Sequence, residues 1–474
     1  MRTLEFIEEI KKGNISVEEN THKFIEDAEK IDKEFAYFNT ISKELAIKQA
    51  KEIDILIKQK KTRGLLLGIP VSVKDCIVVK DVESCAGSRI LKGYVPTFNA
   101  TSVQRCIENG AVIVGKTSQD EFGFGSFSVN VGKGFRVPKN PFDKERVCGG
   151  SSGGSAGITQ KTKFNHISLA ESTGGSIVAP ASFCGVAGLC PTYGLVSRYG
   201  LIDYANSLDK IGPIGKSVED CALMLNVISG YDKKDSTSLN IKKEDYLEYL
   251  KDNNKKFKVA IIKEAFGEGT DENVKNIVLD KLAKSCIEYE EISLPITYEY
   301  SIADYYILAT TEASTNLAKY CGMRYGAAEK LEGNFNEYFS KVRSLNFGEE
   351  AKRRIILGTF ARMAGFREAY YLKALKVRTK IIEEYKTAFK KYDVLISPTM
   401  PILPPKFSDI KKLTPLQNYM IDILTVGPNI SGMPHLSLNA GMKNGLPVGI
   451  LAIADHLQEG KLISFCKDIE NKTN

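Results

Sequence analysis

The sequence has few histidines and no pattern that would let them act with a serine. The four histidines are His22, His166, His435 and His456. A Ser–His–Asp triad would need one of them as its base, and none lies in a recognisable catalytic setting. If the chain is a hydrolase, we therefore expect its base to be another type of residue.

Paired cysteines and long apolar runs are also missing. None of the ten cysteines belongs to a C-x-x-C pair, and no cysteines and histidines have zinc spacing. We expect free thiols in a reducing compartment and no metal site. The longest apolar stretches, such as residues 65–73, are far shorter than the ~20 residues of a membrane span, and the charged start MRTLEF is not a signal peptide. These features predict a cytoplasmic protein without a membrane segment.

The chain also lacks a large excess of charge of either sign. The 65 basic and 58 acidic side chains leave a net charge of +7 over 474 residues, which does not support a dedicated nucleic-acid clamp. The 43% of hydrophobic residues is ordinary for a globular protein. A chain of this length can form about three domains or one large α/β domain.

The order of apolar runs and capping signals predicts an α/β fold. Ser16 and Glu19 have the spacing of a capping box, and apolar residues follow at helical spacing. Helices and strands then alternate, which is typical of a sheet with covered faces. Helices are expected from Val17, over 101–109, after the cap at Ser217 and over 366–392. Strands are expected over 65–73, 111–114, 258–262 and 393–397.

Composition divides the rest of the chain into broad segments. Residues 1–60 are predicted to form N-terminal helices, and residues 231–300, rich in Lys, Glu and Asp, a peripheral layer of the same domain. Residues 123–215 are dense in Gly and Ser but keep frequent apolar residues. A flexible Gly/Ser linker would lack them, so this segment is predicted to form packed loops and tight turns.

Two Gly/Ser clusters occur in that segment, GGSSGGS at 149–155 and STGGS at 172–176. Successive glycine N–H groups can bind an anion, but the phosphate-loop pattern G-x-x-x-x-G-K-[ST] is absent. Two interpretations remain open from the residues alone. The clusters are either a turn-rich structural core or an acyl-transfer site with a serine nucleophile and glycine N–H donors for an oxyanion.

A lysine is the candidate base for the second interpretation. Lys74 ends the apolar run that begins at Leu65. Burial disfavours the charged form of lysine, so a buried amine can accept a proton near pH 7. A lysine after a strand is ordinarily a solvated surface residue, and only its combination with the two serine clusters favours a catalytic role.

The order of these motifs resembles the amidase signature family. The residues that carry the resemblance are GIPVSVKD at 68–75, CGGSSGGS at 148–155, TGGSI at 173–177, PASFCGV at 180–186 and PTYG at 191–194. Further stretches resemble more closely the A subunits of tRNA-dependent amidotransferases within that family. They are VSRYGL at 196–201, NSLDKIGP at 206–213, EASTNL at 312–317, KRRIILGTF at 352–360 and KVRT at 376–379.

The resemblance implies a fold and a catalytic triad. The fold would be a single amidase-signature α/β domain over 1–474, with a central mixed β-sheet covered by helices on both faces. Ser176 would be the nucleophile, Ser151 a serine after a cis peptide bond that relays the proton, and Lys74 the base. Backbone N–H groups would form the oxyanion hole, those of Thr173, Gly174 and Gly175.

The resemblance also implies a substrate and partners. Arg354 and Asp422 match residues that hold the α-carboxylate and α-amino groups of glutamine, and Tyr305 lies where a substrate-contacting tyrosine occurs. Ser176 would form a glutamyl-enzyme and release ammonia. The ammonia would pass to a B subunit that uses ATP and Mg²⁺ to activate Glu-tRNA(Gln), with a small C subunit in the complex. No cofactor is expected in this chain.

The sequence departs from the family pattern at three positions. Most members read DTGGSIR, whereas Ser172 and Val178 replace the Asp and the Arg here, and Cys190 stands where Lys is usual. The spacing from Ser151 to Ser176 is one residue longer than the common pattern, and we expect the extra residue within 160–165. Two other functions stay open: a stand-alone amidase acting on another small amide, and a non-catalytic scaffold protein.

Overall fold

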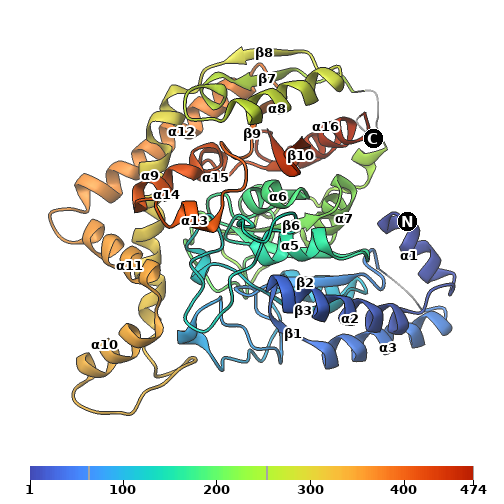
Figure 1. Ribbon diagram of the computed structural model, residues 1–474, viewed down its shortest axis with the longest axis horizontal. Coiled ribbons are helices and arrows are strands. Elements are labelled where there is room, and N and C mark those ends of the chain that lie inside the picture. The colour runs from blue at the N-terminus through green and yellow to red at the C-terminus, as the bar shows by residue number, and fades with distance from the viewer. Residues whose placement is uncertain (62–63, 252–254, 473–474) are drawn as a thin grey trace.

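An eleven-stranded β-sheet runs through the computed structural model, which describes residues 1–61, 64–251 and 255–472 (Figure 1). The strand order is β1-β3-β2-β4-β6-β5-β10-β11-β9-β7-β8. The strands are β1 (Phe38–Ile41), β2 (Pro70–Lys74), β3 (Val112–Thr117), β4 (Ile167–Ser172), β5 (Ala187–Cys190), β6 (Lys210–Gly215), β7 (Val259–Ile262), β8 (Tyr289–Ile292), β9 (Val394–Pro398), β10 (His435–Lys443) and β11 (Leu446–Ile453).

The sheet is mixed, as the resemblance implies. Strand β2 is parallel to both of its neighbours, β3 and β4, and β9, β7 and β8 are parallel to one another at the other end. Every neighbouring pair from β4 through β6, β5, β10 and β11 to β9 is antiparallel, and so is β1 with β3.

Both faces of the central strands are covered. Every residue of β2, β3, β4 and β6 is buried, and successive side chains of a strand point to opposite faces. A strand that is buried throughout therefore has a packed layer on each side. The edge strands β1 and β8 keep partly exposed positions. This confirms a single α/β domain with helices over the sheet.

Helices form the covering layers (Figure 1). The α-helices are α1 (Thr3–Lys11), α2 (Val17–Phe35), α3 (Lys43–Lys58), α4 (Thr101–Glu108), α5 (Gly153–Lys161), α6 (Val178–Cys184), α7 (Val218–Ile228), α8 (Glu272–Lys284), α9 (Pro295–Asn316), α10 (Phe335–Asn346), α11 (Glu349–Arg362), α12 (Lys373–Phe389), α13 (Phe407–Ile410), α14 (Pro415–Met420), α15 (Val426–Ile430) and α16 (Glu459–Asn471). No described helix is long and apolar enough to cross a membrane.

Several elements begin and end where the sequence predicts. Ser16 Oγ accepts a hydrogen bond from the Glu19 N–H at the start of α2. Ser217 and Asp220 form a reciprocal capping box at the start of α7. Helix α4 is followed by Gly110 at φ +82°, a conformation that favours glycine. Strands β7 and β9 agree with the expected strands to within a residue.

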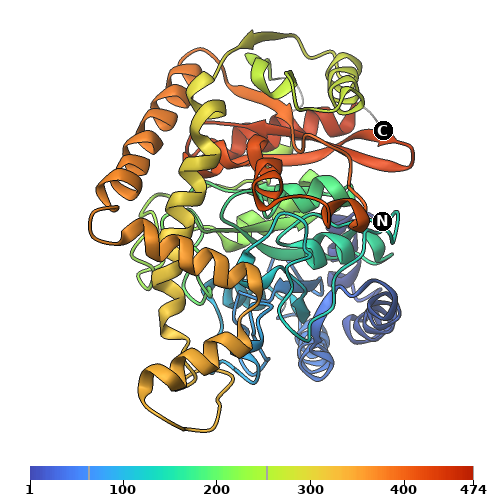
Figure 2. The same cartoon turned by 60° about the vertical axis from the view of Figure 1, so that its left-hand side comes forward.

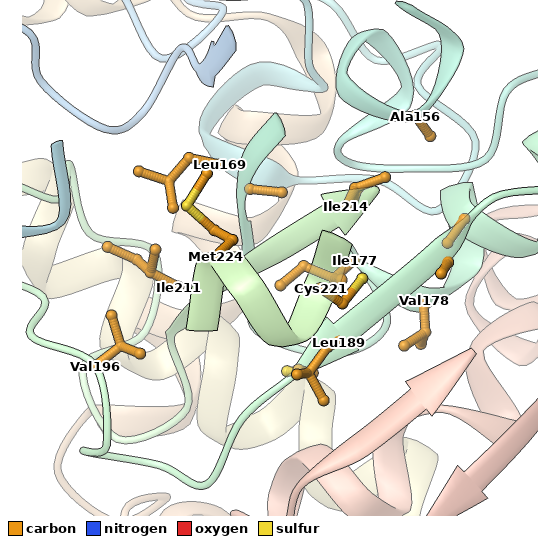
Figure 3. Packing of buried hydrophobic residues seen from close by; sticks show 14 of the residues in the cluster. Ala156, Leu169, Ile177, Val178, Leu189, Val196, Ile211, Ile214, Cys221 and Met224 are labelled. Atoms are coloured by element: carbon orange, nitrogen blue, oxygen red, sulfur yellow. The ribbon is translucent and has the colours of Figure 1, made fainter. Parts of the chain in front are cut away.

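The core beneath the sheet is built by α7 and the strands it covers. Figure 3 shows Leu189 of β5, Ile214 of β6 and Cys221 and Met224 of α7 pointing into one apolar cluster. Every residue of α7 is buried. A helix that is buried on all sides lies inside a large core, which agrees with the apolar residues that make up most of α7.

The strand predicted at 65–73 begins later in the structure than expected. Strand β2 contains only Pro70–Lys74. The preceding residues turn at Gly68, which has φ +70°. The N–H groups of Leu66 and Gly68 donate to the carbonyl oxygens of Asn109 and Gly110 rather than to a neighbouring strand.

Residues 123–215 are packed, as predicted, but they are not only loops and turns. They include helices α5 and α6 and the strands β4, β5 and β6. Glycines occur in α5 because the helix lies against other backbone. A Cβ at Gly154 would lie 2.5 Å from the Tyr37 carbonyl oxygen, and one at Gly157 would lie 2.1 Å from Tyr37 Cε1. Glycine here signals close approach of chain segments rather than a turn.

Two further expectations need correction. Residues 1–60 contain the edge strand β1 between α2 and α3 in addition to helices. The single helix expected at 366–392 is a π-helical turn at Glu368–Leu372 followed by α12. Figure 2 shows α9, in yellow, packed against α11 and α12, in orange, at one side of the molecule.

Candidate active site

Lys74 lies at the end of β2 and is completely buried. Its Nζ donates hydrogen bonds to Ser151 Oγ at 2.7 Å, to the Glu171 carbonyl oxygen at 2.9 Å and to Glu171 Oε2 at 2.8 Å. Strands β2 and β4 are adjacent and parallel, so their carboxyl ends reach the same edge of the sheet. This arrangement excludes the solvated surface lysine that the position alone would favour.

Ser151 lies in the turn before α5, and its hydroxyl accepts the Lys74 hydrogen bond. The peptide bond between Gly150 and Ser151 is cis, where the resemblance places it. Only glycine fits at position 150, because a Cβ there would lie 2.3 Å from Asp120 Oδ2 and 2.6 Å from the Ser128 nitrogen. The dense contacts of this turn hold the Ser151 hydroxyl on the lysine amine.

Ser176 lies between the end of β4 and the start of α6. Its side chain is 7% exposed and makes no hydrogen bond to any described residue. The N–H groups of Gly174 and Gly175 likewise donate to no other residue in the described part of the chain. A hydroxyl and two backbone donors are therefore free at one short loop, which is the requirement for attack on a carbonyl carbon and stabilisation of its oxygen.

The serine loop is braced from the C-terminal half of the chain. Asn429 Nδ2 donates to the carbonyl oxygens of Gly174 and Thr425. A Cβ at Gly175 would lie 2.4 Å from Thr425 Oγ1, so only glycine fits there. Sequence analysis did not identify Asn429 or Thr425, because neither belongs to the Gly/Ser clusters.

Arg354 on α11 lies in an enclosed site rather than in solvent. It is 2% exposed, and its guanidinium donates to Glu350 Oε1 at 2.8 Å and to Tyr204 Oη at 2.6 Å. Burial opposes its charge, but Tyr204 and Glu350 raise the pKa of Arg354 above its usual value. Four aromatic rings lie within 5.2–5.7 Å of its central carbon, those of Phe124, Tyr204, Tyr306 and Tyr419.

Asp422 lies near Arg354 on the 3₁₀ turn Ile421–Leu424 and is also buried. Its Oδ2 accepts hydrogen bonds from Ser126 Oγ at 2.7 Å and from Tyr306 Oη at 2.8 Å, and burial raises its pKa. Its Oδ1 accepts no hydrogen bond from any described residue. Arg354 and Asp422 are thus brought together by Tyr306, which contacts both and which sequence analysis missed.

Tyr305 is the neighbour of Tyr306 on α9, and their rings are 4.9 Å apart. It is buried against the serine loop, because a Cβ at Gly174 would lie 2.8 Å from Tyr305 Oη. The structure therefore places all the sequence-predicted residues in one region. Lys74 contacts Ser151, Tyr305 packs against the loop that carries Ser176, and Tyr306 contacts both Arg354 and Asp422.

The three departures from the family pattern are buried and uncharged. Ser172 Oγ has no hydrogen-bond partner among the described residues, Val178 lies in the core, and Cys190 Sγ lies 3.7 Å from Asn429 Oδ1. A charge at any one of these positions would need a buried partner. Residues 162–166 connect α5 to β4, at the end of α5 remote from Ser151.

Sequence analysis also missed an acidic residue beside Lys74. Glu171 lies on β4, and its carboxylate contacts the amine of Lys74. The available signal was an acidic residue within an otherwise apolar stretch directly before STGGS. No group of three or more His, Cys, Asp or Glu side chains among the described residues is arranged to hold a metal ion.

The fold and the site together define an α/β protein with a buried lysine–serine pair and a second serine whose hydroxyl has no partner among the described residues, an arrangement suited to acyl transfer. The chain belongs to the amidase family, which it matches over residues 19–463. It is 44% identical, over 99% of its own length and 96% of the relative's, to the A subunit of the glutamyl-tRNA(Gln) amidotransferase of Thermoanaerobacter pseudethanolicus. It is 43% identical to the protein of the same name from Trichormus variabilis, over 99% and 97% of the two chains.

Solved structures show the same relationship. The crystal structure of the A subunit of the Thermotoga maritima glutamyl-tRNA(Gln) amidotransferase matches with a TM-score of 0.78 and 34% identity, covering 96% of this chain and 91% of that one. The native peptide amidase from Stenotrophomonas maltophilia matches with a TM-score of 0.82 and 24% identity, over 100% and 97% of the two chains. At that identity, the second match shows the shared fold alone.

Proposed function

We propose that this chain is the glutamine-hydrolysing A subunit of a tRNA-dependent amidotransferase that converts Glu-tRNA(Gln) to Gln-tRNA(Gln). The observation that carries the proposal is the 44% identity, over nearly the whole of both chains, to the A subunit of a glutamyl-tRNA(Gln) amidotransferase. The site supports it, because the residues assigned from the family pattern lie together around one serine loop.

In the first half of the proposed reaction, Ser176 Oγ attacks the side-chain amide carbon of glutamine. The Ser176 proton passes through Ser151 Oγ to Lys74 Nζ, which lie 2.7 Å apart. The carbonyl oxygen becomes an oxyanion, which the N–H groups of the loop Thr173–Gly174–Gly175 stabilise. The C–N bond then breaks, the proton returns to the leaving nitrogen, and ammonia departs from the glutamyl-enzyme.

In the second half, water attacks the glutamyl ester and gives up a proton along the same route. Glutamate leaves, and Ser176 recovers its proton. Lys74 thus acts as base and then as acid in each half. It needs no histidine: His166 contacts Ser72 and Thr159, and His435 contacts Asn429 and the Met433 carbonyl oxygen, so neither ring bonds to Lys74, Ser151 or Ser176.

Arg354 and Asp422 are proposed to hold the two charged groups of glutamine. An arginine hydrogen-bonds a carboxylate strongly, and the enclosed guanidinium of Arg354 would bind the α-carboxylate. Asp422 Oδ1, which has no other hydrogen bond among the described residues, would accept from the α-ammonium. Tyr305, which lies against Gly174, would border the side chain of the substrate close to Ser176.

The ammonia is proposed to reach a B subunit that activates Glu-tRNA(Gln) with ATP and Mg²⁺, in a complex that also contains a small C subunit. Support comes from the relatives' names, which identify each of them as one subunit of an amidotransferase. We assign no ATP, Mg²⁺ or other cofactor to this chain. A tRNA substrate and ten free cysteines suit a cytoplasmic location.

The test is ammonia release from glutamine by this chain co-expressed with its B subunit, measured with and without Glu-tRNA(Gln) and ATP. We expect tRNA-stimulated release that a Ser176→Ala variant loses by about a thousandfold or more. Robust release from other small amides, unaffected by partner or tRNA, would instead establish a stand-alone amidase. Full tRNA amidation by Ser176→Ala would establish a non-catalytic scaffold.

A further inference from the structure

A chain of polar contacts continues behind Lys74, away from the serines. Glu171 Oε2 lies 2.8 Å from Lys74 Nζ, and Glu171 Oε1 accepts a hydrogen bond from Thr173 Oγ1 at 2.9 Å. The same Thr173 hydroxyl lies 2.8 Å from Asp209 Oδ1. All four residues are buried. Thr173 also contributes to the loop that carries Gly174, Gly175 and Ser176, so this network joins the base to the nucleophile loop.

The contacts of Lys74 leave one direction for proton transfer. Its amine has three acceptors, and two of them belong to Glu171. A neutral lysine amine has two N–H donors and one lone pair. With both donors directed to the Glu171 carbonyl and carboxylate, the lone pair points at the Ser151 hydroxyl. Glu171 thus sets the orientation that a base acting through Ser151 needs.

The contacts of Thr173 require a shared proton. Its hydroxyl has one hydrogen but lies between two carboxyl groups. The hydrogen can be donated to only one of them, and the other carboxyl must then donate to the hydroxyl oxygen. Asp209 is the carboxyl to which we assign the proton, since burial and the charge of Glu171 raise its pKa by more than the Ala205 N–H and the charge of Arg198 lower it. The Glu171–Thr173–Asp209 bridge then carries one negative charge, on the side next to Lys74.

We propose that Glu171 is a positioning residue for amide hydrolysis, which holds the Lys74 amine toward Ser151 and, with Asp209, supplies the counter-charge in direct contact with that amine. This role rests on the proposed function of Lys74 as the base. It assigns a fourth side chain to the reaction without giving it contact with the substrate. It also places a carboxylate 2.8 Å from the amine nitrogen.

The other groups that face Lys74 do not replace that charge. The buried Lys116 ammonium is paired with Asp75 at 3.6 Å, so the two charges cancel locally. Burial raises the pKa of the Cys76 thiol, which stays neutral 3.9 Å from Glu171 Oε2. Burial raises the pKa of Asp120 to about 6, so this carboxyl is ionised at neutral pH. Its oxygens accept hydrogen bonds from the N–H groups of Ser128 and Asn130, however, and none from Lys74.

Two substitutions separate charge from orientation. In Glu171→Gln, an amide oxygen can still accept from Lys74, but the negative charge is gone and the amine loses its proton more readily. We expect the acid side of the kcat/KM profile for glutamine to move to lower pH by about one unit or more, with KM changed less than twofold. In Glu171→Ala both charge and acceptor are lost, and kcat should fall at least tenfold below that of Glu171→Gln.

The matched control is Glu459→Gln, the same substitution at a buried glutamate that accepts a hydrogen bond from the Thr192 N–H instead. It should leave the pH profile unchanged. If turnover of Glu171→Gln is too slow to follow, the rate at which a fluorophosphonate probe labels Ser176 can be measured against pH instead. Labelling requires the same proton transfer from Ser176 through Ser151 to Lys74. Ser176→Ala, which should block labelling, shows that the probe reports this serine.

The outcomes distinguish this inference from the proposed function. If the acid side of the kcat/KM profile does not move in Glu171→Gln while Ser176→Ala is inactive, the role of Glu171 is wrong and the proposed function is still supported. Undiminished ammonia release by Ser176→Ala would overturn the function itself. Equal kcat for Glu171→Gln and Glu171→Ala would contradict the orienting role.

Discussion

At several positions around the site, the neighbouring atoms decide which residue type can be accommodated. Glycine is required at 174 and 175 because Tyr305 and Thr425 occupy the space that a Cβ would fill. Arg354 and Asp422 are both buried, and each has polar partners that limit the cost of holding a charged group out of water. A titratable side chain that is buried without such partners should make the free energy of unfolding depend strongly on pH.

Asp304 on α9 is such a side chain. It is 2% exposed, and neither carboxyl oxygen has a hydrogen-bond partner among the described residues. Burial raises its pKa from 3.8 to about 7, partly offset by Arg378. Because the folded pKa is raised, the free energy of unfolding is highest below the unfolded pKa and falls as pH rises from about 4 to about 7.

Asp304→Asn should therefore stabilise the protein at pH 8 by about 1–3 kcal/mol and have little effect at pH 4.5. The measurement is thermal unfolding of both proteins across this range. Asp280→Asn, at an exposed position of α8, is the control and should show no such trend. A stability gap between Asp304→Asn and wild type that is the same at both pH values would contradict the argument.

At the scale of elements, helices with capping signals were predicted correctly, whereas elements rich in Gly and Ser were not. Helices α2 and α7 have polar caps followed by apolar residues, a local pattern that survives in the fold. Helices α5 and α6 and strands β4 to β6 were missed because Gly and Ser were interpreted as turn formers. Their glycines serve contacts with residues distant in sequence, such as Tyr37 against α5, and a local pattern cannot show that.

The cap of α7 gives an element-scale prediction. Ser217 Oγ accepts a hydrogen bond from the Asp220 N–H at 3.2 Å, so Ser217→Ala should lower the free energy of unfolding by about 1 kcal/mol. Ser229 at the other end of α7 has a buried hydroxyl without a partner among the described residues. Ser229→Ala should cost less than Ser217→Ala in denaturant unfolding, and the reverse order would refute the assignment of the cap.

At the scale of the whole molecule, the sheet decides which side chains meet solvent. Ten free cysteines are distributed over the fold. Cys286 is exposed and Cys321 partly exposed, whereas the other eight are buried in the layers that cover the sheet. Accessibility of thiols therefore reports the integrity of the packed layers as one unit.

An aromatic disulfide reagent such as DTNB should modify about two thiols of the folded protein rapidly, those of Cys286 and Cys321. It should modify all ten only after unfolding in denaturant. Peptide mapping of the labelled protein identifies the sites. Cys286→Ser should remove one rapid equivalent. Rapid reaction of Cys76 or Cys190 in the folded protein would show that the site region opens to solvent.

The sequence by itself determined the family resemblance and the α/β class. The resemblance, rather than the residues alone, assigned candidate roles to Lys74, Ser151, Ser176, Arg354 and Asp422. Tertiary structure alone decided the extents of β2 and α12, the bracing by Asn429 and Tyr306, and the place of Glu171 beside Lys74. Those contacts join residues from different elements, up to 255 positions apart for Asn429 and Gly174. Only the parallel alignment of β2 with β4 and the packing of Tyr305, Thr425 and Asn429 against the serine loop bring such residues together.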